Sequence, residues 1–119
     1  MSNSRLPHDH HSAMEQDFDH MPAPEAFGLT AGLFKLMGDP SRVRLFWLLC
    51  HCEECVLNLS VMMDMSSPAL SHHLKLLKDS RLIVSRREGK EVYYRASDSV
   101  RAEALHHMIE RIAEIACPE

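Results

Sequence analysis

The sequence lacks any apolar run that approaches the roughly 20 residues needed to span a bilayer. Its first 21 residues are polar and rich in histidine, without the apolar centre of a secretory signal peptide. We therefore expect a cytoplasmic protein with no membrane partner. Its four cysteines are then reduced thiols or metal ligands rather than structural disulfides.

The sequence also lacks the common signatures of enzymes. It has no recognisable nucleotide-binding loop and no nucleophile–base arrangement. Cys52 and Cys55 form a C-x-x-C pair, which in a dithiol enzyme opens a helix after a strand of a βαβ unit. Because the sequence indicates no such unit, we expect a protein without enzymatic activity.

What is present is enough for one globular domain, with 119 residues of which 45% are hydrophobic and 25% charged. The net charge of −4 is unevenly distributed. Residues 1–26 hold one cation and five acids, a balance of −4, whereas residues 67–101 hold eight cations and four acids, a balance of +4. The basic region indicates a surface that faces phosphates.

The chain is expected to divide into a flexible, His-rich tail over residues 1–22 and a domain over residues 23–119. His8, His10 and His11 lie in the tail. Short His-rich tracts either bind metal or are solvated polar segments, and composition alone favours the solvated segment.

Hydrophobic periodicity and capping residues predict five helices, at about 24–37, 40–50, 55–64, 67–78 and 99–116. Asp39 is the expected N-cap of the second helix, followed by Pro40 at its first position. Ser67 and Pro68 are expected to open the fourth helix in the same way. A three-residue turn, Met65, Ser66 and the expected N-cap Ser67, joins the third and fourth helices, which is typical of a helix-turn-helix.

After the fourth helix the pattern changes to β-branched and aromatic runs at 82–87 and 91–96, separated by a turn at Gly89. The expected fold is therefore mainly α with a two-stranded β wing, a winged helix-turn-helix. The last helix has an apolar stripe that we expect to pack on the last or first helix of a second copy in a homodimer, formed by Leu105, Met108, Ile109, Ile112 and Ala116.

The fourth helix has two distinct faces. Leu70, Leu74 and Leu77 form a stripe that we expect to be buried, with His73 packed beside it. The opposite face carries side chains suited to base edges and phosphates, Ser67, Ala69, Ser71, His72, Lys75 and Lys78. Taken alone, this pattern also fits an ordinary amphipathic surface helix.

Cys50, Cys52 and Cys55 form a C-x-C-x-x-C cluster. Thiolates at this density suit Zn(II), Cd(II), Pb(II) or As(III). Cys50 also fits a buried apolar position on the second helix. Cys52 and Cys55 are expected near the start of the third helix, where the helix dipole favours the thiolate.

Three motifs occur in a fixed order: Leu33-Phe34-Lys35-Leu36-Met37-Gly38-Asp39-Pro40-Ser41-Arg42, then Ser71-His72-His73-Leu74-Lys75-Leu76-Leu77, then Gly89-Lys90-Glu91-Val92-Tyr93-Tyr94. Over about residues 24–116 the sequence resembles the ArsR/SmtB family of metal-sensing winged-helix repressors. The resemblance implies a homodimer that binds an imperfectly palindromic operator and releases it when metal binds. The DNA contacts that it implies are Ser67, Ala69, Ser71, His72 and Lys75 on the helix, and Arg86, Arg87 and Lys90 on the wing.

One metal site of the family begins its third helix with Cys-Val-Cys. Cys55 matches the first cysteine and Leu57 the second, so Cys52 would have to substitute. Some members complete this site with N-terminal ligands, for which the candidates are His8, His10 and His11. Nitrogen ligands beside thiolates favour Zn(II) or Cd(II), whereas three sulfurs alone would allow As(III).

A second family site lies on the last helix. Val100 and Arg111 occupy its two imidazole positions and cannot bind metal, so the usual form of this site is absent. Four other residues are clustered within two turns and form either a shifted site or a solvated helix edge: Glu103, His106, His107 and Glu110. Cys117 could add a sulfur ligand across a dimer, or play no part.

The leading hypothesis is a repressor released by a thiophilic metal. A repressor that responds to arsenic or to thiol oxidation is the alternative. A metal-buffering protein is a third hypothesis, against which the basic helix and wing argue.

Overall fold

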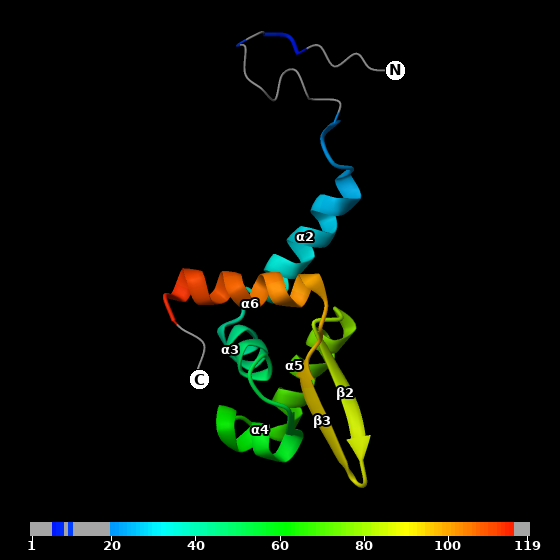
Figure 1. Ribbon diagram of the computed structural model, residues 1–119, viewed down its shortest axis with the longest axis vertical. Coiled ribbons are helices and arrows are strands. Elements are labelled where there is room, and N and C mark those ends of the chain that lie inside the picture. Colours follow the sequence, from blue (N-terminus) through cyan, green and yellow to red (C-terminus); the bar gives the residue numbers. More distant parts are fainter. Residues whose placement is uncertain (1–5, 9, 11–19, 116–119) are drawn as a thin grey trace. The chain divides into compact units, whose positions relative to one another are not determined.

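The computed structural model describes residues 6–8, 10 and 20–115 (Figure 1). His11, Ala116 and Cys117, which entered the predictions above, lie outside the described residues. The chain divides into two compact units, residues 1–32 and 33–119, which are described separately. No helix among the described residues is long and apolar enough to cross a membrane.

The part of the chain that the structure describes contains five α-helices and three strands. In chain order they are α2 (Pro24–Leu36), α3 (Pro40–Leu49), β1 (Glu54–Cys55), α4 (Val56–Met63), α5 (Ser67–Asp79), β2 (Ile83–Glu88), β3 (Glu91–Ala96) and α6 (Val100–Ala113). The expected fold, mainly α with a β wing, is confirmed. Figure 1 shows α6 across one side of α3 and the β2–β3 hairpin extending away from the helices.

Helix α3 begins where the sequence predicts, because Asp39 caps it. The Asp39 carboxylate accepts hydrogen bonds from the backbone N–H groups of Ser41, at 2.8 Å, and Arg42, at 3.2 Å. These bonds, above all the one from Arg42, hold the pKa of Asp39 below its usual range. Such caps satisfy backbone donors that the first turn of a helix leaves unpaired.

The turn between α4 and α5 consists of Asp64, Met65 and Ser66, one residue earlier than predicted. Asp64 adopts φ 54°, a left-handed conformation that lets its N–H and that of Met65 bond to carbonyls of the last turn of α4. The predicted N-cap of α5, Ser67, is wrong: the cap is Ser66, whose Oγ accepts from the N–H of Ala69 at 3.3 Å. Two adjacent serines precede the proline, and either fits the capping pattern.

The sheet has three antiparallel strands rather than the two predicted. Strand β3 lies between β2 and β1 in the order β1-β3-β2, with Cys55 opposite Tyr93 and Glu54 opposite Tyr94. Strand β1 has only two residues, too few for an alternating pattern to reveal it. Cys55 therefore belongs to β1 and is the N-cap residue of α4, instead of the first residue of that helix. Gly89 adopts φ 64° in the β2–β3 turn, a conformation that glycine tolerates without strain.

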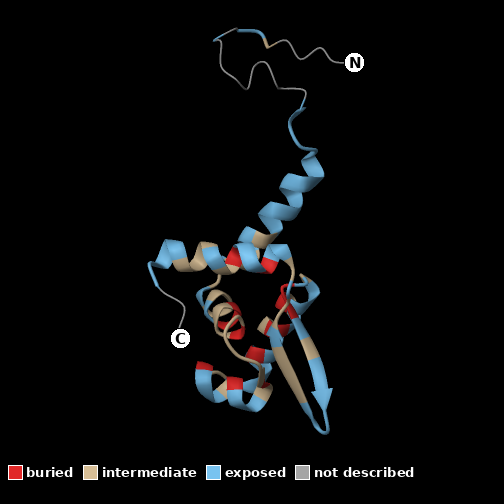
Figure 2. Ribbon diagram, in the orientation of Figure 1, coloured by how far each residue is buried: buried red, intermediate tan, exposed pale blue. Residues whose placement is uncertain are grey.

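The core lies between α3, α4, α5, the base of the hairpin and α6, as the buried positions in Figure 2 indicate. Helix α6 contributes Ala102 and Leu105 fully, and Met108 and Ile109 in part. The expectation that this stripe packs chiefly on a second copy is therefore wrong for its first half, which packs within the chain. Ile112 remains 76% exposed.

Candidate functional site

One face of α5 is exposed and polar. Its other face is fixed by Leu70, Leu74 and Leu77, which are buried in the core. The residues predicted to contact DNA are all exposed on the outer face, namely Ser67, Ala69, Ser71, His72 and Lys75. Lys75 forms an ion pair with Asp79 one turn later, at 2.9 Å, and both side chains remain largely exposed. The buried leucines therefore anchor a helix that presents short donors, an imidazole and a cation to its surroundings.

His73 lies between these two faces and is half-buried. Its Nδ1 is 3.4 Å from Nη1 of Arg42 on α3. This arrangement is consistent with the predicted packing role of His73 between helices.

Arg86 on the wing is engaged within the protein. Its Nη2 and Nε donate to the two carboxylate oxygens of Glu53, at 2.9 and 3.0 Å, and its guanidinium also pairs with Glu88 and stacks over Tyr93. The hydrogen bonds from Arg86 lower the pKa of Glu53, and those to Glu53 and Glu88 raise that of Arg86. Of the three predicted wing contacts, Arg86 is thus the one held by acids.

Arg87 and Lys90 differ from Arg86. Both are exposed, and neither forms an ion pair with any residue in the described ranges. Together with the outer face of α5 they form what we call the basic surface, made of Ser67, Ala69, Ser71, His72, Lys75, Arg87 and Lys90.

The three cysteines of the C-x-C-x-x-C cluster occupy different surroundings. Cys50 is the half-buried C-cap of α3, Cys52 donates its thiol to the carbonyl of Leu48 at 3.4 Å, and Cys55 is 7% exposed in β1. The expectation that a helix dipole favours the Cys52 thiolate is wrong. Cys52 lies in the loop after α3, and burial, followed by the charge of Glu54, raises its pKa.

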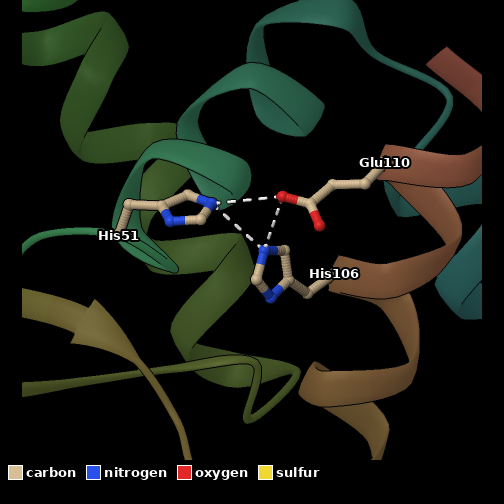
Figure 3. A group of neighbouring side chains, drawn as sticks. All are labelled: His51, His106 and Glu110. Atoms are coloured by element: carbon tan, nitrogen blue, oxygen red, sulfur yellow. Dashed lines mark hydrogen bonds and ion pairs between the residues drawn. The ribbon is translucent and has the colours of Figure 1, made fainter. Parts of the chain in front are cut away.

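Among the described residues, a single group of three potential metal ligands converges: His51, His106 and Glu110. The imidazoles approach each other with their Nε2 atoms 3.1 Å apart. Oε2 of Glu110 lies 3.3 Å from Nε2 of His51 and 3.0 Å from Nε2 of His106. Figure 3 shows His51 coming from the turn after α3, and His106 and Glu110 from successive turns of α6. We call these residues the His–Glu triad.

The triad is partly buried, with side-chain exposures of 17%, 17% and 11% for His51, His106 and Glu110. Trp47, one turn before His51, donates its indole N–H to the same Oε2 of Glu110 at 3.0 Å. The Trp47 and His51 rings are 4.5 Å apart. A tryptophan, two histidines and a carboxylate therefore hold the end of α3 against α6.

The triad includes part of the predicted second site. His106 and Glu110 belong to it, whereas Glu103 and His107 are exposed and outside it. Sequence reasoning missed His51, although its spacing of four residues after Trp47 places both side chains on one side of a helical turn. Cys50, Cys52 and Cys55 do not form a group of three ligands within the described residues. His8 and His10, from the other unit, are exposed.

An open cleft adjoins the triad. It is lined by His51 and Cys52 on one side and by Ala102, Glu103 and His106 on the other. The triad is thus partly shielded yet reachable from solvent through the cleft.

The sequence matches a family model described as bacterial regulatory protein, arsR family, over residues 39–85. It is 40% identical over 78 residues to an arsenical resistance operon repressor of Escherichia coli, covering 65% of this chain and 67% of that protein. It is 42% identical over 69 residues to a transcriptional repressor SmtB homolog of Synechocystis, covering 58% of this chain and 52% of that protein. The chain therefore spans about half the length of the Synechocystis relative.

The fold is similar to that of a solved Mycobacterium bovis domain, described as a homodimeric winged helix-turn-helix DNA-binding domain of a possible ArsR-family regulator. The TM-score is 0.67 at 24% sequence identity, covering 79% of this chain and 88% of that one. At this identity the likeness shows the fold alone.

Proposed function

Because the chain belongs to the arsR family of bacterial regulatory proteins, we propose that it is a homodimeric transcriptional repressor that binds operator DNA and releases it on binding a metal ion. The observation that carries the proposal is the basic surface, in which an exposed polar helix face lies on the same domain as a wing with exposed cations. This chemistry serves DNA rather than catalysis.

The two parts of the basic surface have different roles in the proposal. Ser71 and His72 project from the first half of α5, where a recognition helix contacts base edges in the major groove. Lys75, Arg87 and Lys90 contact phosphates, which fixes register without reading sequence. Arg86 is bonded to Glu53, so in the proposal it contacts a phosphate only after these hydrogen bonds break.

A homodimer is supported by apolar side chains that one copy leaves exposed. On α6, Val100 is 83% exposed and Ile112 is 76% exposed. On α2, Phe27, Leu29 and Phe34 are each more than half exposed. Because a two-fold dimer presents two recognition helices, the expected operator is an imperfect palindrome with half-sites about one helical turn apart.

For the effector we propose a thiophilic ion, Zn(II), Cd(II) or Pb(II), bound by Cys52 and Cys55, with Cys50 and the tail histidines His8, His10 and His11 as further ligands. Three cysteines within six residues support this set, and reduced thiols fit a cytoplasmic protein. As(III) bound by the three sulfurs alone is the alternative. Binding at this site requires the thiols to leave their present surroundings, a rearrangement that could be coupled to DNA release.

The test is fluorescence anisotropy with duplexes selected from a random library by the full chain. We expect selected duplexes to bind at least about 10³ times more tightly than unselected ones. Lys90→Ala should weaken binding to all sequences and reduce the salt dependence, whereas Ser71→Ala should relax the preference at one base pair. Weak binding that does not depend on sequence would contradict the proposal and favour a metal-buffering protein.

A further inference from the structure

We propose that the His–Glu triad is a second, sulfur-free metal site, which takes Zn(II) or a similar borderline divalent cation and links α3 to α6 within one chain. The site is separate from the cysteines, and the inference does not depend on DNA binding. The histidines come from elements 55 residues apart in the sequence, and the fold alone brings them together.

The spacing of the ligand atoms fits a tetrahedral cation. The three atoms, Nε2 of His51, Nε2 of His106 and Oε2 of Glu110, are separated by 3.0 to 3.3 Å. Ligands about 2.0–2.1 Å from a tetrahedral zinc are about 3.3 Å from one another. A cation could therefore bind all three with side-chain shifts of a few tenths of an ångström, because the backbone already holds the ligands in place.

Hydrogen bonds among the three ligand atoms themselves cannot engage all of them at once. Each neutral imidazole carries one N–H and one lone pair. If both Nε2 atoms carry a proton and donate to Glu110, two N–H groups face each other across 3.1 Å. If one Nε2 donates to the other, the accepting Nε2 has no proton, and the single N–H must be shared with the carboxylate. A cation at the centre accepts a lone pair from each of the three atoms at once.

The surroundings suit a partly open site. The indole N–H of Trp47 donates to the ligating oxygen of Glu110 and orients it, as outer partners of metal ligands do. The cleft beside His51 and His106 gives access from solvent and room for a water as the fourth ligand. Two nitrogens and one carboxylate oxygen are typical zinc ligands, whereas As(III) prefers thiolates.

The test uses Co(II) and Zn(II) with the full chain in which Cys50, Cys52 and Cys117 are replaced by serine and the buried Cys55 by alanine. We expect one Co(II) per chain, with the visible spectrum of a nitrogen- and oxygen-ligated ion and no sulfur charge-transfer band. Because Trp47 is the chain's one tryptophan and contacts the triad, Co(II) should also quench its fluorescence. Should the cysteine-free chain not fold, the quenching is read by comparing the unmodified chain with its His106→Ala variant, because cobalt bound only by the cysteines would quench both equally.

His106→Ala and Glu110→Gln should each weaken Co(II) binding at least about tenfold, since even the loss of an outer partner costs 10–100-fold. His107→Ala is the matched control, because His107 is the exposed neighbour outside the triad. The same assay on a chain with His8, His10 and His11 changed to glutamine should give unchanged binding. The proposal is overturned if the triad variants bind and quench as the parent does, or if His107 or the tail histidines account for the binding.

Discussion

Two sets of potential metal ligands meet at the end of α3, and they differ in how closeness in sequence relates to closeness in the fold. Cys50, Cys52 and Cys55 are close in sequence, yet the fold gives each a different environment. His51 lies 55 and 59 residues from His106 and Glu110, yet their ligand atoms are within 3.3 Å of one another. Proximity in sequence and proximity of ligand atoms are thus separate properties.

The physical reason is the path of the backbone. Helix α3 ends at Leu49, and the chain then turns and enters β1 at Glu54. Side chains around such a turn point in several directions, so neighbours in sequence diverge. Residues on successive turns of one helix, such as His106 and Glu110, point the same way, and the packing of α6 on α3 adds His51.

The largest expected effect comes from removing the packing that forms the triad. Leu105→Ala truncates a side chain that is 5% exposed and anchors α6 in the core. We expect it to lower the free energy of unfolding by about 2–5 kcal/mol, measured by urea denaturation, and to weaken Co(II) binding by the triad. Cys55 lies in β1, paired with β3 and outside the cleft beside α6, so its reactivity toward a thiol reagent in the folded state should change much less.

Ile112→Ala is the control for that variant, because it removes a similar side chain from the same helix at an exposed position. In the isolated subunit it should change the free energy of unfolding by less than about 0.5 kcal/mol. If both variants lower the free energy of unfolding equally, the buried first half of α6 is not what anchors this helix in the core.

A smaller effect is expected for Trp47→Phe. The change keeps the aromatic ring but removes the N–H that donates to Glu110. Losing a hydrogen bond to a charged group should lower the free energy of unfolding by about 1.5–3 kcal/mol. Zinc affinity, measured by competition with a chelator, should fall about tenfold. Unchanged zinc affinity would argue that Glu110 is oriented without Trp47.

Asp39 caps α3, the helix that ends just before Cys50 and His51, one member of each ligand set. We expect Asp39→Ala to cause a smaller loss of stability than Trp47→Phe, in urea denaturation at neutral pH. The pKa of Asp39 is lowered in the folded chain, so its carboxylate stabilises the fold above its ordinary pKa of about 3.9, and this contribution is lost as pH falls through the lowered value. Asp39→Asn keeps a capping oxygen but should lack this pH dependence. If the free energy of unfolding varies with pH in the same way in Asp39→Asn and in the parent chain, the Asp39 carboxylate is not its source.

The smallest effect concerns Glu53, which follows the cysteine Cys52 and holds Arg86 on the wing. Glu53→Gln should loosen Arg86 and raise affinity for operator DNA by about two- to fivefold, the range that an exposed ion pair supports. Glu91→Gln removes the same charge from the wing at a carboxylate that forms no ion pair within the described residues. If both variants strengthen DNA binding equally, the release of Arg86 contributes nothing.

Much of the fold could be predicted from local signals. Asp39 and Pro40 identify the start of α3, and Leu70, Leu74 and Leu77 identify the buried face of α5. The predictions of the α5 N-cap and of a two-stranded sheet were wrong because the local signals there are ambiguous or absent. Two adjacent serines fit one cap, and a two-residue β1 is defined only by its pairing with β3.

The basic surface could be anticipated because exposure follows helical periodicity, as at Ser71 and His72. What periodicity could not predict is which charges are already paired, as Arg86 is with Glu53. Only two members of the triad, His106 and Glu110, could be grouped from the sequence, because they lie four residues apart on one helix face. The contribution of His51 depends on tertiary packing, which the sequence pattern does not encode.

The central claim, a DNA-binding repressor that metal releases, is tested most directly by one titration. The full chain is titrated into its selected duplex at fixed salt, with and without a saturating divalent ion, and the dissociation constants are compared. A coupling energy of 1–3 kcal/mol predicts that metal weakens binding by about 5- to 150-fold. Equal affinity for the duplex with and without saturating zinc, cadmium, lead and arsenite would contradict the claim.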